Sequence, residues 1–167
     1  FKESLQKALV SRETGFSGLD RIFDLNKNQI EKKLKENIPN KILLVAEAIR
    51  KKINLKRIFA LSKIDPWFLE QIKEIVDNET KIKIKGLPKD FVEFNRIKSI
   101  GFSDKKLSEL TNSSEDLVRR KRMALKILPV FKKVDTCAAE FKSFTPYMLS
   151  LIHISEPTRR NPISYAV

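Results

Sequence analysis

The sequence predicts an all-α fold, a multi-helix bundle of short helices, with one extended segment near residues 127–134. Apolar residues recur at spacings of three and four through most of the chain, which is the period of an amphipathic helix. Residues that cap helices stand just before several of these stretches. Strand patterns are nearly absent outside 127–134, where Pro129 and β-branched residues favour extended chain. With 167 residues, 41% of them hydrophobic, the chain has enough apolar material for one core.

The clearest helix starts at Asp65. Its carboxylate can accept hydrogen bonds from the free N–H groups of a first turn, and Pro66 has its φ already fixed for the first helical position. An apolar stripe follows that needs a partner surface, while the charged residues between face solvent. We expect this helix to be a core element without chemistry of its own that continues to about Ile84. The predicted stripe is Phe68, Leu69, Ile72, Ile75 and Val76.

Short amphipathic helices are predicted on both sides of this one. Pro39 ends the second of the helices before it, and Asn54 caps the fourth. These four helices are predicted over 2–10 (with Leu5, Ala8 and Leu9 on one side), 26–35, 41–52 and 55–62. After it, Pro88 is predicted to open a helix that turns Phe91, Val92 and Ile97 inward and ends at Gly101. Ser103 is then predicted to cap 104–111, and Ser113 or Ser114 a helix to about Leu125.

An internal similarity appears when the chain is shifted by 49 residues. Both copies then read as a short helix, a polar turn and a longer helix, which is typical of two packed helical hairpins or of a helix-turn-helix unit. In the second copy, residues 119–122 are all basic and could lie in a DNA groove. Four consecutive residues surround a helix, so some of them must face the protein. The matched positions are Ile58, Leu61, Ser62, Phe68 and Leu69 with Leu107, Leu110, Thr111, Leu117 and Val118.

The formal net charge of +13 raises the question of a polyanionic partner. The lysines are spread through nearly every segment, however, and aromatic residues are not interleaved with them as on a platform that stacks nucleic-acid bases. We therefore interpret the charge mainly as solvated helix faces. The alternative to this interpretation is that the chain is a basic helical nucleic-acid-binding domain of helix-turn-helix type.

The residues needed for common catalytic and metal sites are scarce. One cysteine, Cys137, and one histidine, His153, cannot supply a zinc site or a nucleophile with its base. Cys137 has small neighbours and is interpreted as buried packing. The closest carboxylate pairs, Asp65 with Glu70 and Asp135 with Glu140, are interpreted as a helix cap and as solvated or ion-paired groups. We expect no catalytic, cofactor-binding or metal-binding residue here. A complete small enzyme is kept as a further hypothesis, beside a nucleic-acid-binding domain and a scaffold.

Other features of the sequence bear on phosphate binding and on cellular location. Four scattered glycines do not form a phosphate-binding loop. No apolar run is long enough to span a bilayer and no signal pattern opens the chain, so no membrane contact is expected. A single cysteine suits a reducing compartment, and we expect the cytoplasm.

The last 19 residues, 149–167, are similar to the translation of a transposase-type sequencing adapter and are set aside from fold reasoning. His153 belongs to this tail. Without the tail, the chain carries 32 basic and 20 acidic residues, a charge of +12.

Four sequence motifs resemble the large subunit of carbamoyl phosphate synthetases, in that family's order, over residues 1–148. They are Val134-Asp135-Thr136-Cys137-Ala138-Ala139-Glu140-Phe141, Tyr147-Met148, Glu3-Ser4-Leu5-Gln6-Lys7-Ala8-Leu9 and Ile64-Asp65-Pro66-Trp67-Phe68-Leu69. The resemblance implies the helical oligomerisation domain between two ATP-grasp halves. Residues 1–20 would end the carboxyphosphate half, so that the natural chain would begin upstream, and 21–148 would form the oligomerisation domain and the start of the next linker. Asp65 to Phe68 and Asp135 to Phe141 would be structural signatures.

The same resemblance implies a parent enzyme, an ATP-dependent carbon–nitrogen ligase of the glutamine-hydrolysing type. It would make carbamoyl phosphate from bicarbonate, glutamine-derived ammonia and two ATP, for arginine and pyrimidine biosynthesis. It would work with a small glutaminase subunit, Mg²⁺ (or Mn²⁺) and K⁺. The family's nucleotide and metal residues lie in the flanking halves and none matches a position here. This segment would be a non-catalytic scaffold that also offers a surface for self-association.

Overall fold

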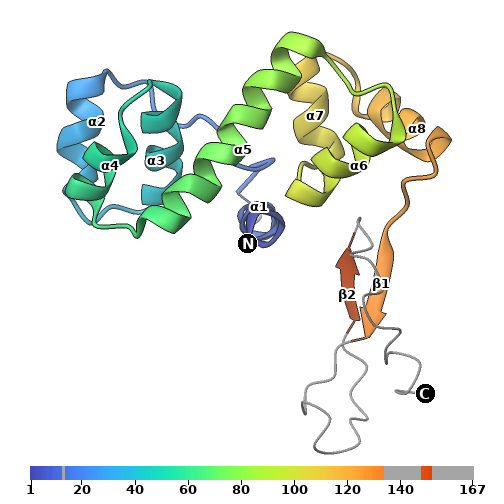
Figure 1. Ribbon diagram of the computed structural model, residues 1–167, viewed down its shortest axis with the longest axis horizontal. Helices are drawn as coiled ribbons and strands as arrows, with labels where there is room; N and C mark the ends of the chain where they lie inside the picture. Colours follow the sequence, from blue (N-terminus) through green and yellow to red (C-terminus); the bar gives the residue numbers. More distant parts are fainter. Residues whose placement is uncertain (13, 134–147, 152–167) are drawn as a thin grey trace, which may run out of the picture.

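The computed structural model describes residues 1–12, 14–133 and 148–151 (Figure 1). Within them the fold is all-α apart from one pair of short strands, as predicted. None of the described helices is both long and apolar enough to cross a membrane. The helices are α1 Lys2–Ser11, α2 Lys27–Leu34, α3 Lys41–Arg50, α4 Leu55–Ser62, α5 Pro66–Lys85, α6 Phe91–Ile100, α7 Asp104–Thr111 and α8 Glu115–Ala124, and the strands are β1 Val130–Lys133 and β2 Met148–Leu151.

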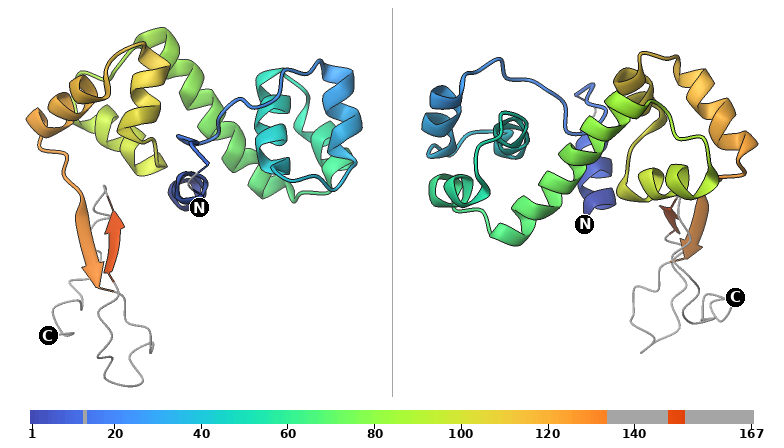
Figure 2. Two further views of the ribbon diagram at one scale, coloured as in Figure 1. Left: turned by 180° about the vertical axis from the view of Figure 1, so that it is seen from behind. Right: turned by 45° about the horizontal axis from the view of Figure 1, so that its top comes forward.

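The long helix α5 joins two groups of short helices (Figures 1 and 2). Helices α2, α3 and α4 lie at its beginning, and α6, α7 and α8 lie at its end. Helix α1 packs beside the middle of α5 and also contacts α6. The prediction that this helix is a core element is therefore confirmed, because both helical groups contact it.

Local capping residues set the helix starts, as predicted. The side chains of Asn54 and Asp65 each accept a hydrogen bond at 2.8 Å, from the backbone N–H of Lys56 and of Trp67. The cap of α8 is Ser114, the second of the two serines considered. Because these contacts need only neighbouring residues, they can be predicted without knowledge of the tertiary structure.

The 49-residue repeat is present in three dimensions. Helix α7 begins and ends 49 residues after α4, and α8 begins 49 residues after α5. Three of the five paired positions share their burial. Ile58 and Leu107 are fully buried, as are Leu69 and Val118, whereas Phe68 and Leu117 are 41% and 45% exposed. The repeat is thus two helical hairpins packed on a common core, the first of the two interpretations given above.

Burial at the start of α5 differs from the prediction at one position. Leu69, Ile72, Ile75 and Val76 are buried as expected, but Phe68 is exposed. Phe68 lies at the edge of the stripe, where its ring contacts Phe1 rather than the core. Periodicity identifies the centre of an apolar stripe better than its margin.

Helix α6 also differs in detail. It begins at Phe91 with Asp90 as its cap, not at Pro88, and Phe91 and Val92 are 50% and 75% exposed rather than inward. Its inward face is Phe94, Ile97 and Ile100, at a spacing of three. Val92 is two residues from Phe94, on the opposite side of the helix, and Phe91 lies one turn nearer the helix start.

Helix α1 and the C-terminal strands complete the comparison. Helix α1 buries Gln6 and Leu9, while Ala8, predicted on the inward side, is exposed. The extended segment predicted over 127–134 contains β1, which pairs antiparallel with β2, Val130 opposite Leu151. The predictions for Val134 to Phe141 concern residues outside the described ranges. Of the tail 149–167, only residues 149–151 are described, and they lie in β2.

Candidate functional site

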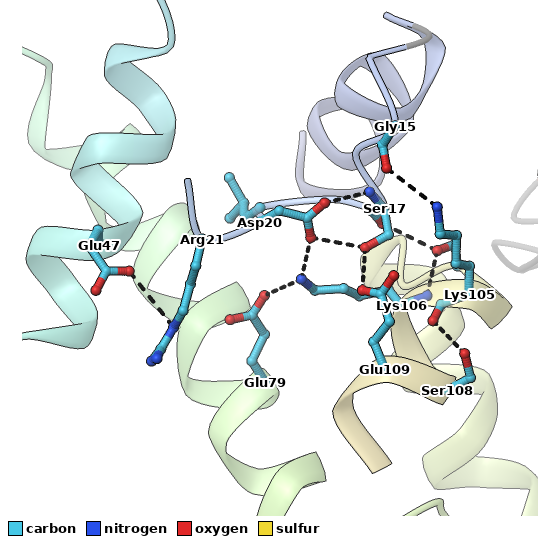
Figure 3. Close-up of polar contacts among 12 residues, drawn as sticks. Gly15, Ser17, Asp20, Arg21, Glu47, Glu79, Lys105, Lys106, Ser108 and Glu109 are labelled. Atoms are coloured by element: carbon cyan, nitrogen blue, oxygen red, sulfur yellow. Dashed lines mark hydrogen bonds and ion pairs between the residues drawn. The ribbon is translucent and has the colours of Figure 1, made fainter. Parts of the chain in front are cut away.

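Charged and polar side chains from four segments, several of them buried, meet along α5 (Figure 3). The segments are residues 17–21, which follow α1, and helices α3, α5 and α7. We call this set the α5 ion network and define it as Ser17, Asp20, Arg21, Glu47, Arg50, Glu79, Lys106 and Glu109.

Arg50 of α3 and Glu79 of α5 form the centre of the network, and their side chains are 6% and 5% exposed. Arg50 donates from Nε and Nη2 to the same carboxylate oxygen, Glu79 Oε2, at 3.1 and 2.8 Å. Its Nη1 lies 3.4 Å from Glu47 Oε2, and its Nη2 also donates to the backbone carbonyl of Leu19. The exposed Arg21 lies at the rim, 3.8 Å from Glu47. Arg50 therefore ties α3 both to α5 and to the segment after α1.

Lys106 of α7 reaches the same carboxylate from the other helical group. Its Nζ donates to Asp20 Oδ1 at 2.5 Å and lies 3.7 Å from Glu79 Oε1. Glu79 Oε1 is otherwise without a hydrogen-bond partner among the described residues. The single carboxylate of Glu79 thus lies between a cation from each group of helices.

Ser17 and Asp20 attach the segment after α1 to this centre. The backbone N–H of Ser17 donates to Asp20 Oδ2 at 2.6 Å, and Ser103 Oγ donates to the Ser17 carbonyl at 3.2 Å. Ser17 Oγ lies 2.9 Å from Asp20 Oδ1 and 2.7 Å from Glu109 Oε2. Burial raises the pKa of Asp20, but the hydrogen bonds from Lys106 and Ser17 outweigh it and hold the pKa below its ordinary value.

A second buried cluster holds the α6–α8 group together. Lys98, only 2% exposed, donates to the Phe102 carbonyl at 2.6 Å and to Asp104 Oδ1 at 2.8 Å. Arg122 donates from Nε to Asp104 Oδ2 at 3.0 Å and from Nη1 to the Ile127 carbonyl at 2.8 Å. Burial lowers the pKa of Lys98 despite its bond to Asp104. Burial raises the pKa of Asp104, but Lys98 and Arg122 bring it below its ordinary value.

These two clusters provide structural contacts between helices. Their carboxylates and cations pair with one another, and among the described residues Glu79 Oε1 has Lys106 at 3.7 Å but no hydrogen bond. In the described residues, no three His, Cys, Asp or Glu side chains are placed to hold a metal ion together. What the α5 ion network can do is fix the position of one helical group relative to the other.

Sequence reasoning missed the α5 ion network, because charged residues are expected on the solvent side of amphipathic helices. Glu79 did carry a signal. It lies three, four and seven residues after Val76, Ile75 and Ile72, so it extends their buried stripe. A charged residue on such a stripe needs a buried partner of opposite sign.

The predicted signature residues fall into two sets. Asp65 and Pro66 form the start of α5, and Trp67 and Phe68 lie beside them with exposed rings. These four residues lie together at the beginning of α5, and none of them belongs to the α5 ion network. Residues 135–141, the other signature, lie outside the described ranges.

Several of the basic residues 119–122 of α8 are engaged in contacts within the protein. Besides the Arg122 contacts above, Lys121 donates to the Leu87 carbonyl at 3.5 Å. Arg120 donates from Nε to the Asp116 carbonyl of its own helix at 3.4 Å. The expectation that some of these residues face the protein is confirmed.

Residues 1–126 match the family model described as the oligomerisation domain of the carbamoyl-phosphate synthetase large chain. The chain belongs to this family. The matched residues include α1 to α8 and every member of the α5 ion network. The resemblance found in the sequence motifs is therefore confirmed, and the comparisons give no support to the nucleic-acid alternative.

Curated relatives of this chain carry the same family name. Carbamoyl phosphate synthase large chains from Brucella melitensis and Rhizobium meliloti are 44% and 45% identical, each over 90% of this chain. The large chain from Campylobacter jejuni is 41% identical over 95% of this chain. The matches cover 13%, 14% and 15% of these relatives, so the chain spans about one seventh of their length.

Proposed function

We propose that this chain is the helical oligomerisation segment of a carbamoyl phosphate synthase large chain, and that its own task is mechanical. The observation that carries the proposal is the family match over residues 1–126. Its buried charges support a mechanical role, because they connect helices from both groups. The segment would hold neighbouring parts of the large chain in position and offer a surface for self-association.

The activity of the parent is part of the proposal. The parent would be an ATP-dependent, glutamine-hydrolysing carbon–nitrogen ligase of the cytoplasm that makes carbamoyl phosphate for arginine and pyrimidine synthesis. ATP, Mg²⁺ (or Mn²⁺) and K⁺ would bind in the flanking ATP-grasp halves, and the small glutaminase subunit would deliver ammonia.

The proposed domain boundary near residue 20 has a physical consequence. Helix α1 and residues 17–20 pack against α5, α6 and α7 through Ser17, Asp20 and Gln6, whose side chain donates to the Ile100 carbonyl at 3.0 Å. If residues 1–20 end the preceding synthetase half, that half is anchored to the scaffold through buried contacts rather than through a loose linker.

Two measurements test the proposal. Sequencing the source DNA upstream of the Phe1 codon should show an open frame that encodes an ATP-grasp domain, and adapter bases should follow the Met148 codon. Equilibrium dialysis of the purified chain with radiolabelled ATP and Mg²⁺ should show no saturable binding. An unrelated upstream frame, or stoichiometric ATP binding by this chain alone, would contradict the proposal.

A further inference from the structure

A small basic cavity lies between the end of α5, the connection over residues 86–90 and α6. We call it the α5–α6 cavity. Its apolar lining includes Ile82 and Ile97, which are each 2% exposed. Its volume is about 260 Å³, below the usual range of sites that enclose a cofactor or a drug-sized molecule. The cavity therefore suits a small ion or a small metabolite.

The charges that line the α5–α6 cavity favour an anion. Two carboxylates, of Asp90 and Glu93, contribute to the lining, and Asp90 already accepts a hydrogen bond from the Glu93 N–H at 2.8 Å as the cap of α6. Four cations less these two carboxylates leave a charge of +2, which attracts anions and repels metal cations. The four cations are Lys81, Lys85, Lys89 and Arg96, and none of them forms an ion pair within the part of the chain that the structure describes.

A buried amide adds a second requirement for the ligand. Asn78 of α5 is 3% exposed and also lines the cavity. Its Nδ2 donates at 2.7 Å to the Glu74 carbonyl, one turn nearer the helix start, so Oδ1 is turned towards the next turn, where Lys81 and Ile82 line the cavity. Among the described residues, no group donates a hydrogen bond to this oxygen. Buried polar atoms are nearly always hydrogen-bonded, so Asn78 Oδ1 favours a ligand that carries a donor.

We propose that the α5–α6 cavity binds the phosphate group of a small ligand that also carries a hydroxyl donor. The lysines and Arg96 attract the phosphate oxygens, and the hydroxyl donates to Asn78 Oδ1. Free phosphate meets both requirements, because it keeps at least one O–H at neutral pH. A hydroxylated phosphate monoester meets them through a hydroxyl of its carbon skeleton. Sulfate has the same tetrahedral shape but no proton at neutral pH, so it leaves the Asn78 acceptor without a partner.

Isothermal titration calorimetry of the purified chain tests the proposal with three probes: inorganic phosphate, glycerol 3-phosphate and sulfate. Neutral pH and a fixed ionic strength are used throughout, because a chain of net charge +13 attracts every anion to some extent. We expect one saturable site for at least one of the two phosphates, and sulfate to bind about tenfold more weakly or less. Tighter binding of inorganic phosphate would identify the free ion as the ligand, and tighter binding of glycerol 3-phosphate a hydroxylated monoester.

Matched variants separate the cavity from the general charge of the chain. Lys85→Gln and Lys83→Gln each remove one positive charge from the last turn of α5, but only Lys85 lines the cavity. We expect Lys85→Gln to weaken phosphate binding about tenfold and Lys83→Gln to weaken it less than about twofold. Asn78→Leu removes the buried acceptor and should abolish the preference for phosphate over sulfate. Circular dichroism of each variant checks that the helices remain folded.

Several results would overturn the proposed site. They are the lack of saturable binding for both phosphates, equal affinities for phosphate and sulfate, equal effects of the two lysine variants, and a preference for phosphate that a folded Asn78→Leu variant retains. The site does not depend on the scaffold function proposed above, because it is argued from the lining of the cavity alone. Its failure would leave that function in place.

Discussion

The α5 ion network predicts a large cost for a small change at Glu79. Glu79→Gln keeps the shape of the side chain but removes the charge that faces Arg50 at 2.8 Å and Lys106 at 3.7 Å. Removing one partner of a buried ion pair typically costs about 3–5 kcal/mol. Because the glutamine carbonyl still accepts a hydrogen bond from Arg50, we expect the lower end, a loss of about 3 kcal/mol in the free energy of unfolding.

Urea unfolding followed by circular dichroism at 222 nm measures this loss. The matched control is Glu74→Gln on the same helix, where the pair with Lys2 is partly exposed, at 47% and 26%. Exposed pairs contribute at most about 1 kcal/mol, so the control should stay within that limit. Equal effects of the two variants, with an unchanged dependence on urea, would refute the argument that the network joins the helical groups.

Three further predictions concern backbone geometry, pH and the repeat. Gly101→Ala should lower the free energy of unfolding by about 2–4 kcal/mol, because Gly101 has a φ of +104° and its added Cβ would clash with α1. Gly86→Ala is the control: its φ is +78°, but the added Cβ would lie in open space, so the loss should be about 1 kcal/mol. Similar losses for the two variants in urea unfolding would contradict this. The folded pKa of Asp104 is below its ordinary value of 3.8, so its ionised form stabilises the fold above that pH and the stabilisation is lost as pH falls through the folded pKa. Asp104→Asn should therefore flatten the acid side of the melting-temperature profile, and an unaltered slope would count against it. Ile58→Ala and Leu107→Ala, both at fully buried positions, should each cost about 2–5 kcal/mol by calorimetry; a negligible loss at either would show that the two hairpins do not share the core equally.

Local signals predicted the helices well. Asn54, Asp65 and Ser103 each begin a helix at the predicted residue, because a cap is a contact between a side chain and its own first turn. The 49-residue similarity also predicted which positions share an environment. Both kinds of signal are contained in the order of the residues along the chain.

Burial at helix margins and the buried charges depended on tertiary contacts instead. Phe68 and Val92 were expected inward, but neighbouring helices leave both exposed. Lys98 and Lys106 are buried because Asp104 and Asp20, from other turns of the chain, meet them. No spacing rule relates residues 20 and 106, so the partners of the buried charges could be found only in the folded structure.

Sedimentation velocity of the purified chain, from micromolar to near-millimolar concentration, tests the proposed scaffold role most directly. If the segment carries a surface for self-association, a species of at least twice the 19.4 kDa mass should increase with concentration. A single 19.4 kDa species at every concentration would contradict self-association through this segment.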